Sequence, residues 1–274
     1  MKTETRAIIE KWYKRLGFPC ELDAAFYRAL DTVEIDETVP YTEYDVKSTD
    51  GKRNLLQYLY YCEETERRYK ELGIDEEIMI DTMQDIVIYT DVWTNEMKGG
   101  ELYLGQLEWV RRTHALTLFN LGRLQFGFGK SCVEDEAGGI ARGEDIIEIH
   151  IPRGKPLTPE VCLQSIRMAN DFFKKHFPEY KYNFYTCNSW LLGKEIQEEL
   201  RPDSNIVKFD KLFTITDNYT ENDGGLRYVF GWSMTRENKD SFVATNSLAR
   251  LLKEKVDKGE LLTAGRGYFH KDKY

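Results

Sequence analysis

The chain has few cysteines and no motif that pairs them. Its five cysteines are an odd number, lie far apart and include no C-x-x-C pair; they are Cys20, Cys62, Cys132, Cys162 and Cys187. A disulfide framework needs an even set, and a zinc ribbon needs closely spaced pairs. The sequence therefore excludes both and indicates a reducing compartment.

Long apolar runs, clustered positive charge and metal-ligand spacing are also lacking. No stretch approaches the ~18 apolar residues that a membrane helix needs, and residues 1–17 lack the apolar segment of a signal peptide. The 47 Asp and Glu residues outnumber the 38 Lys and Arg residues, for a net charge of −9, whereas nucleic acid and anionic lipid bind clustered positive charge. No His, Asp or Glu cluster has metal spacing. We therefore expect a cytoplasmic, bacterial-style protein with no nucleic-acid partner, no membrane partner and no metal.

What the chain does contain divides into two parts of different periodicity. Up to about Phe126 apolar residues recur every three or four positions, as on one face of a helix. The helices predicted in this way span Thr5–Arg15, Asp23–Leu30, Asn54–Leu72, Asp75–Glu96 and residues 107–121. Residues 1–126 are therefore predicted to form a helical N-terminal domain.

After Gly127 the pattern becomes that of an α/β domain. A segment rich in Gly and acidic residues, 127–145, indicates a hairpin or loop that joins the two halves. Short apolar and β-branched segments predict strands, and amphipathic segments predict helices. The strands are expected at Arg123–Phe128, Ile146–Ile151, Tyr182–Leu192, Ile206–Thr216 and Leu226–Trp232, and the helices at Pro159–Phe177 and Thr245–Asp257. The basic, aromatic C-terminal segment is expected to be a frayed tail. Residues 127–274 are thus a second domain, and the fold class is α/β (α+β).

The segment from Glu144 to Glu160 reads as a strand that leads through a basic turn into a helix. Thr158 followed by Pro159 is a strong helix start, and the N–H groups of a first helical turn can hold phosphate. With Arg153, Gly154, Lys155 and Thr158 beside them, they form a candidate phosphate site. An ordinary strand-to-helix loop with solvated basic residues is the alternative.

Alternation along the same strand separates its side chains by face. Ile147, Ile149 and Ile151 point one way, whereas Glu148 and His150 share the opposite face. A carboxylate and an imidazole side by side are candidates for a general base and its partner. Equally, the two side chains could form a hydrogen bond to each other inside a sheet and have a structural role only.

The strand after the helix carries three further polar candidates. Cys187 and Ser189 share one face, and Asn188 lies on the other. Ser189 or Asn188 could donate a hydrogen bond to an acyl carbonyl without any shift in pKa. Cys187 could act as a nucleophile only if a base lowered its pKa, so a buried structural cysteine is the expected reading.

Four segments occur in the same order in one family of bacterial proteins. They are LGRLQF (Leu121–Phe126), IHIPRGKPLTPE (Ile149–Glu160), CNSWLL (Cys187–Leu192) and PDSNIVKF (Pro202–Phe209). From about Trp93 to Phe269 the chain resembles bacterial acyltransferase-domain proteins. Those have a helical N-terminal domain and a C-terminal domain similar to the Gcn5-related N-acetyltransferase (GNAT) fold, with a mixed sheet.

The resemblance implies an activity and a place for the candidates. Ile146–Ile151 would be the central strand beside acyl-CoA, the helix from Pro159 would cap the pyrophosphate, and Tyr182–Leu192 would splay away to leave a slot for pantetheine. The implied function is transfer of an acyl group from acetyl-CoA or another acyl-CoA to an amine or hydroxyl of a small-molecule acceptor. Glu148 and His150 would lie beside that acceptor. The resemblance implies no oligomeric state.

Two features depart from the family's pattern and keep rivals open. The acetyltransferase loop Q/R-x-x-G-x-G/A is absent, and fewer glycines leave fewer N–H groups able to approach phosphate closely. The family has a histidine where this chain has Asn188, which weakens a catalytic role for that position. The rivals are a non-catalytic module that binds CoA or another small molecule, and a cysteine hydrolase that uses Cys187.

Overall fold

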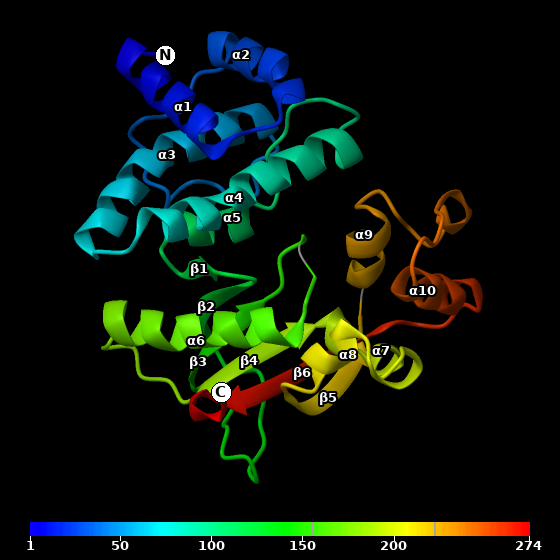
Figure 1. The fold of residues 1–274 in the computed structure, drawn as a ribbon. Coiled ribbons are helices and arrows are strands. Elements are labelled where there is room, and N and C mark those ends of the chain that lie inside the picture. Colours follow the sequence, from blue (N-terminus) through cyan, green and yellow to red (C-terminus); the bar gives the residue numbers. More distant parts are fainter. Residues whose placement is uncertain (155, 222) are drawn as a thin grey trace. The chain divides into compact units, whose positions relative to one another are not determined.

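The structure, a computed structural model, describes residues 1–154, 156–221 and 223–274 of the chain. Two compact units divide these residues, Met1–Phe119 and Asn120–Tyr274. The first unit is helical and the second is built on a mixed sheet (Figure 1). The α/β (α+β) fold class predicted from the sequence is therefore confirmed.

The first unit consists of amphipathic helices whose ends follow local rules. The helices are α1 (Thr3–Leu16), α2 (Asp23–Thr32), α3 (Gly51–Glu71), α4 (Glu76–Val92), continued by a π-helical turn (Trp93–Met97), and α5 (Leu107–His114). Asp50 begins α3 by accepting a hydrogen bond from the Arg53 N–H. Gly17 ends α1 in the left-handed conformation that glycine adopts without strain.

The helix predicted over residues 107–121 is too long. It ends at His114, and the residues from Leu118 onward form a strand instead. Leu116 has a φ of 54°, a left-handed conformation that a right-handed helix does not accommodate. The apolar spacing of three and four residues therefore continued by chance across a turn.

The second unit carries a mixed sheet with helices between its strands. The strands are β1 (Leu118–Leu121, which spans the division between the units), β2 (Leu124–Lys130), β3 (Asp145–His150), β4 (Phe184–Ser189), β5 (Thr214–Thr220) and β6 (Thr263–His270). Their order is β1-β2-β3-β4-β6-β5. β3 and β4 are parallel and α6 (Pro159–His176) connects them, as expected for a strand–helix–strand unit; β2–β3, β4–β6 and β5–β6 are antiparallel.

The two faces of the sheet differ in what covers them. Figure 1 shows α6 lying along one face, where its Phe173 ring packs 5.4 Å from that of Phe128. Ile147 and Ile149 are fully buried, as the alternation predicted. Glu148 and His150 keep about a third of their side-chain surface exposed. The polar residues of β3 thus lie on the face away from α6.

Three predictions for the C-terminal half are wrong. Residues 206–216 are not one strand: Ser204 caps α8 (Asn205–Asp210), and β5 begins at Thr214. Residues 226–232 fall largely in α9 (Gly224–Phe230), whose Leu226 is buried against α10 (Ser247–Asp257). The C-terminal segment is not a frayed tail but β6, paired on both edges. For α9 and β6, tertiary packing overrides local propensity, whereas α8 begins at a local cap.

The Gly-rich acidic segment is a hairpin connection, as predicted, but it does not join the two halves. Residues 131–144 connect β2 to β3 within the second unit and do not join the two halves. Val133 and Ile140 of this connection are buried against Ile146, Phe184 and Tyr268. The loop therefore covers part of the polar-side face of the sheet at the end where β3 begins.

Candidate active site

The ladder between β3 and β4 ends before either strand does. Its recorded pairs are Ile147 with Tyr185 and Glu148 with Thr186. β3 continues to His150, still paired with Gln125 of β2, and β4 continues to Ser189, still paired with Gly265 of β6. We call the region where the two strands continue without pairing to each other the strand opening. It is bordered by residues 149–150 of β3 and 187–189 of β4. It is the splayed arrangement that the resemblance implied.

Glu148 and His150 lie at the β3 side of the strand opening and contact each other. The distance from His150 Nε2 to Glu148 Oε2 is 3.2 Å. Because a carboxylate only accepts hydrogen bonds, this contact in a neutral imidazole requires the ring proton on Nε2, which would make Nδ1 the basic nitrogen. The same pair would result from either alternative left open by the sequence, a catalytic dyad or mutual satisfaction.

A glycine of the neighbouring strand makes room for this carboxylate. A Cβ on Gly129 would lie 2.6 Å from Cγ and 2.7 Å from Oε1 of Glu148, closer than a carbon atom is tolerated. The backbone of Gly129 is extended within β2, a conformation that any residue adopts. Its value is the absent side chain.

On the β4 side, the three candidates separate as their alternation requires. Asn188 is exposed and pairs with Arg266 of β6, and its Oδ1 accepts a 2.5 Å hydrogen bond from the Tyr219 hydroxyl. Ser189 lies on the other face, and its Oγ accepts from the Leu191 N–H to begin a short 3-10 turn. Thus the structure brings Asn188, not Ser189, to the face of Glu148 and His150.

Cys187 is a core residue. Its side chain is 1% exposed, and burial, followed by the Asp210 charge, raises the pKa of its thiol far above the ordinary range. A nucleophilic cysteine needs the opposite shift and access to substrate. The cysteine-hydrolase alternative is therefore not supported by the geometry.

The basic turn before α6 is engaged by its own surroundings. Arg153 Nη2 donates to the carbonyl oxygens of Arg227 (2.9 Å) and Tyr228 (3.1 Å) near the end of α9, where a cation complements the helix dipole. Gly154 has a φ of 128°, which only glycine adopts readily. Lys155 lies outside the residues that the structure describes.

The start of α6 differs from the predicted hydroxyl cap. Thr158 occupies the N-cap position, and Pro159 follows as predicted, yet the Thr158 side chain makes no capping bond to the described residues of the first turn. The Glu160 carboxylate accepts from its own N–H and from the Thr158 hydroxyl, and these two bonds hold the pKa of that carboxyl below its usual range. The carboxylate occupies part of the anion-binding helix start.

One cation beside this turn was missed. Arg123, from the turn between β1 and β2, donates from Nη1 to the Pro152 carbonyl (3.0 Å), and its N–H donates to Ser165 Oγ on α6 (2.7 Å). Burial lowers the pKa of its guanidinium. A signal was present, since Arg123 belongs to the segment LGRLQF, but only the fold brings that segment beside α6.

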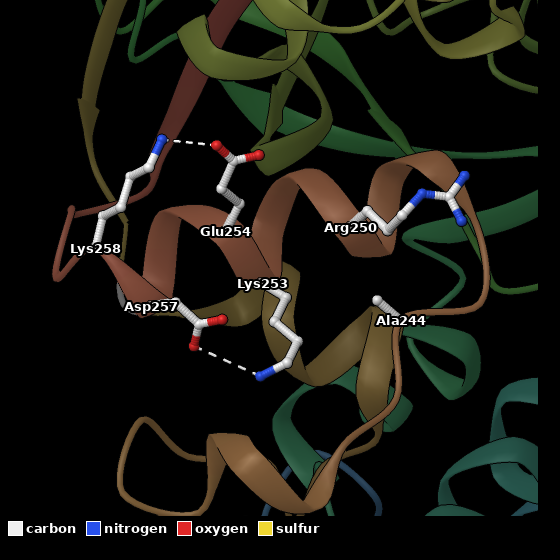
Figure 2. Close-up of a pocket in the computed structure, with 6 residues that line it drawn as sticks. All are labelled: Ala244, Arg250, Lys253, Glu254, Asp257 and Lys258. Carbon is white, nitrogen blue, oxygen red and sulfur yellow. Dashed lines mark hydrogen bonds and ion pairs between the residues drawn. The ribbon is translucent and has the colours of Figure 1, made fainter.

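Hollows elsewhere on the second unit do not coincide with these residues. One of about 400 Å³ lies on α10 (Figure 2), where Lys258 is paired with Glu254 at 2.6 Å and Lys253 with Asp257 at 3.5 Å. Both of its carboxylates are thus paired with lysines of the same helix. Another hollow, of about 700 Å³, lies at the C-terminal end of α6, whereas the basic turn precedes the N-terminal end. Its lining includes Lys174, Tyr182 and Lys271.

The described residues contain neither a metal-binding cluster nor a membrane-spanning helix. No group of three or more His, Cys, Asp or Glu side chains among them could hold a metal ion. Within residues 1–154, 156–221 and 223–274, no helix has both the length and the apolar character needed to cross a membrane.

Comparison with known proteins agrees with the fold. The family described as "GNAT-like C-terminal domain" matches residues 118–269. No curated protein matches the chain. A solved acyltransferase in complex with decanoyl-CoA and teicoplanin is 21% identical, with a TM-score of 0.74, and the match covers 95% of this chain and 87% of that one. A mutant acyltransferase in complex with octanoyl-CoA is also 21% identical over the same shares, with a TM-score of 0.75.

Proposed function

We propose that this chain, which belongs to the family with a GNAT-like C-terminal domain, transfers an acyl group from acyl-CoA to an amine or hydroxyl of a small-molecule acceptor. The strand opening carries the proposal, because Glu148 and His150, a pair of acid–base type, lie on its β3 side where the ladder to β4 stops. Pantetheine would enter this opening as an extended chain between β3 and β4.

Glu148 and His150 would handle the proton of the acceptor. The acceptor nitrogen or oxygen bonds to the thioester carbonyl carbon while its proton passes to Nδ1 of His150, and Glu148 stabilises the resulting imidazolium. The carbon–sulfur bond then breaks, and the CoA sulfur leaves with the bonding electron pair. The proton passes from His150 to that thiolate or to solvent, which returns the imidazole to its neutral form.

The turn before α6 would hold the phosphates of CoA. Arg153, Gly154, Lys155 and Thr158 are the proposed ligands, and Arg123 supplies a further cation next to Pro152. Binding would require Arg153 to exchange the carbonyls of α9 for phosphate oxygens, which are the stronger acceptors because they are charged. This exchange replaces the missing glycines by side-chain cations.

For the acceptor, the acyl donor and the cellular compartment we propose classes only. The solved acyltransferases carry decanoyl-CoA or octanoyl-CoA, and one carries teicoplanin, so a small-molecule acceptor and medium-chain donors are the first to be tested here. We place the protein in the bacterial cytoplasm, where its five free cysteines would stay reduced. The two compact units would act as two domains.

Thermal shift and thiol release test the proposal together. Acetyl-, octanoyl- and decanoyl-CoA should each be compared with CoA alone, because a ligand that binds only the folded protein raises its unfolding temperature. Release of free CoA thiol should then require an amine or hydroxyl acceptor from a panel. Failure of every acyl-CoA to stabilise the protein would overturn the proposal. Stabilisation without acceptor-dependent thiol release would instead support the non-catalytic CoA-binding module.

A further inference from the structure

A β-bulge in β5 decides which side chains reach the β4 wall of the strand opening. Ile215 pairs with Gly267 of β6, but the next pair is Asp217 with Arg266, so that Thr216 is the extra residue. Because side chains alternate, an unbroken strand would place Thr216 and Asn218 on the face of Arg266. Because of the bulge, Asp217 and Tyr219 lie on that face in place of Thr216 and Asn218. Bulges commonly redirect side chains beside active sites.

The redirected side chains form a continuous line that ends at Asn188. Asp217 Oδ2 pairs with Arg266 Nη1 at 2.6 Å. The Arg266 guanidinium lies 4.2 Å from the centre of the Tyr219 ring, and the Tyr219 hydroxyl bonds to Asn188 Oδ1 at 2.5 Å. Asn188 and Arg266 are themselves directly paired between β4 and β6. The line therefore crosses three adjacent strands on one face.

The charge on Arg266 sets the direction of the last hydrogen bond. A cation over the face of a phenol attracts its π electrons and makes the hydroxyl a better donor and a poorer acceptor. The hydroxyl therefore donates, and the atom of Asn188 that receives it is the carbonyl oxygen, not the amide nitrogen. With Oδ1 held in this way, the two N–H bonds of Nδ2 point away from Tyr219.

We propose that Tyr219 is a positioning residue that turns the Asn188 amide into a hydrogen-bond donor to the acyl carbonyl oxygen of the bound thioester. This inference rests on the proposed acyl transfer. Asn188 is exposed and lies two residues beyond the last ladder pair, on the face of His150. As the acceptor attacks from the His150 side, the carbonyl oxygen gains negative charge, and a donor already in place stabilises it without reorganising.

The orientation can be tested without any ligand. In ¹⁵N spectra the side-chain NH₂ signals of Asn188 are identified as those missing from Asn188→Asp. Tyr219→Phe keeps the ring under Arg266 but removes the donor, so these signals should shift and their exchange with water should quicken. Tyr60→Phe, which removes a hydroxyl in the helical unit, should leave them in place. Unchanged Asn188 signals in Tyr219→Phe would overturn the positioning role.

The infrared stretch of the thioester carbonyl tests whether Asn188 donates a hydrogen bond to it. With acyl-CoA carrying ¹³C at the carbonyl, the infrared stretch should fall on binding to the wild type and return toward the free value in Tyr219→Phe. Acceptor turnover should drop about tenfold in Tyr219→Phe and about 100-fold in Asn188→Asp. In Tyr219→Phe, which adds no titratable group, KM for acyl-CoA and the pH profile should stay unchanged. Bound acyl-CoA with an unshifted carbonyl in the wild type would overturn this inference while acyl transfer stands. Absence of binding would overturn both.

Discussion

Glu148 and Thr186 form the last recorded pair of the ladder between β3 and β4, and the polar residues of the candidate site follow it on both strands. His150 lies two residues later on β3, and Asn188 lies two residues later on β4. In a parallel ladder such residues would face each other across a closed sheet. Here the strands remain paired on their outer edges only, so both side chains border an opening.

Glu148→Gln should lower acyl transfer by about 100-fold, within the range for general acid–base catalysis. The amide is isosteric but neutral, so it stabilises the imidazolium of His150 poorly. Binding of acyl-CoA, measured by calorimetry, should change little. Glu198→Gln on the exposed face of α7 (Lys194–Glu199) is the matched control. Wild-type turnover in Glu148→Gln would show that the pair is structural.

Gly129→Ala should reduce turnover nearly as much as Glu148→Gln without touching an ionisable group. The new methyl group would occupy the place of the Glu148 carboxylate and force it to another rotamer, away from His150. Because the displaced side chain is flexible and partly exposed, the unfolding midpoint should fall by little. The double variant Gly129→Ala/Glu148→Gln should be no slower than Glu148→Gln alone. Additive losses would contradict the shared cause.

Asp210→Asn should stabilise the protein at neutral pH. Burial raises the pKa of Asp210 from 3.8 to about 6, so the folded state holds this proton more tightly than the unfolded state does. Stability therefore falls as pH rises from about 4 to 6, and the cost is complete above that range. Asparagine carries no charge and removes this cost. The free energy of unfolding should therefore rise by about 1 kcal/mol, after allowance for the partial exposure of Asp210. Urea titrations at pH 8 and pH 4 should show the gain only at pH 8.

His114 should make the protein sensitive to acid in the opposite sense. It is fully buried, its Nδ1 lies 2.8 Å from Thr65 Oγ1, and burial lowers its pKa to about 3. The unfolded state takes up a proton near pH 6.5 and the folded state does not, so stability is complete above pH 6.5 and falls below it. Between pH 7 and 4.5 this loss is about 3 kcal/mol.

The matched variant separates this group from the many carboxylates that also titrate in acid. His114→Gln should be less stable at pH 7 but should lose less stability on acidification than the wild type does. Urea midpoints across pH 4.5–7.5 measure both slopes. Equal slopes for the two proteins would assign the acid sensitivity to other groups.

Much of the candidate site could be predicted from sequence because it depends on short-range rules. Strand alternation placed Glu148 and His150 on one face, and the structure records their contact. The Pro159 start of α6 and the parallel β3–α6–β4 unit follow from helix-start preferences and from chain connectivity. Burial of Cys187 was the expected reading for a cysteine within an apolar strand.

Other parts depended on contacts between distant residues. Asp217, Tyr219 and Arg266 were not candidates, because β5 was assigned in part to a strand from residue 206 and β6 to a frayed tail. The contact of Arg153 with the carbonyls of Arg227 and Tyr228 was not predicted, because those carbonyls come from a segment predicted to be a strand. A helix end supplies free carbonyl oxygens, whereas a paired strand does not, so this contact could not be expected before the helix α9 was known.

By itself the sequence determined the helical first part, the alternating faces of β3 and the helix start after the basic turn. These depend on periodicity and capping, which neighbouring residues specify. Only the tertiary structure decided that the ladder between β3 and β4 stops at Glu148, that a bulge turns Tyr219 toward Asn188, and that Arg123 lies beside Pro152. Such features arise from pairing and packing between residues 29 to 54 positions apart, for which a local pattern holds no information.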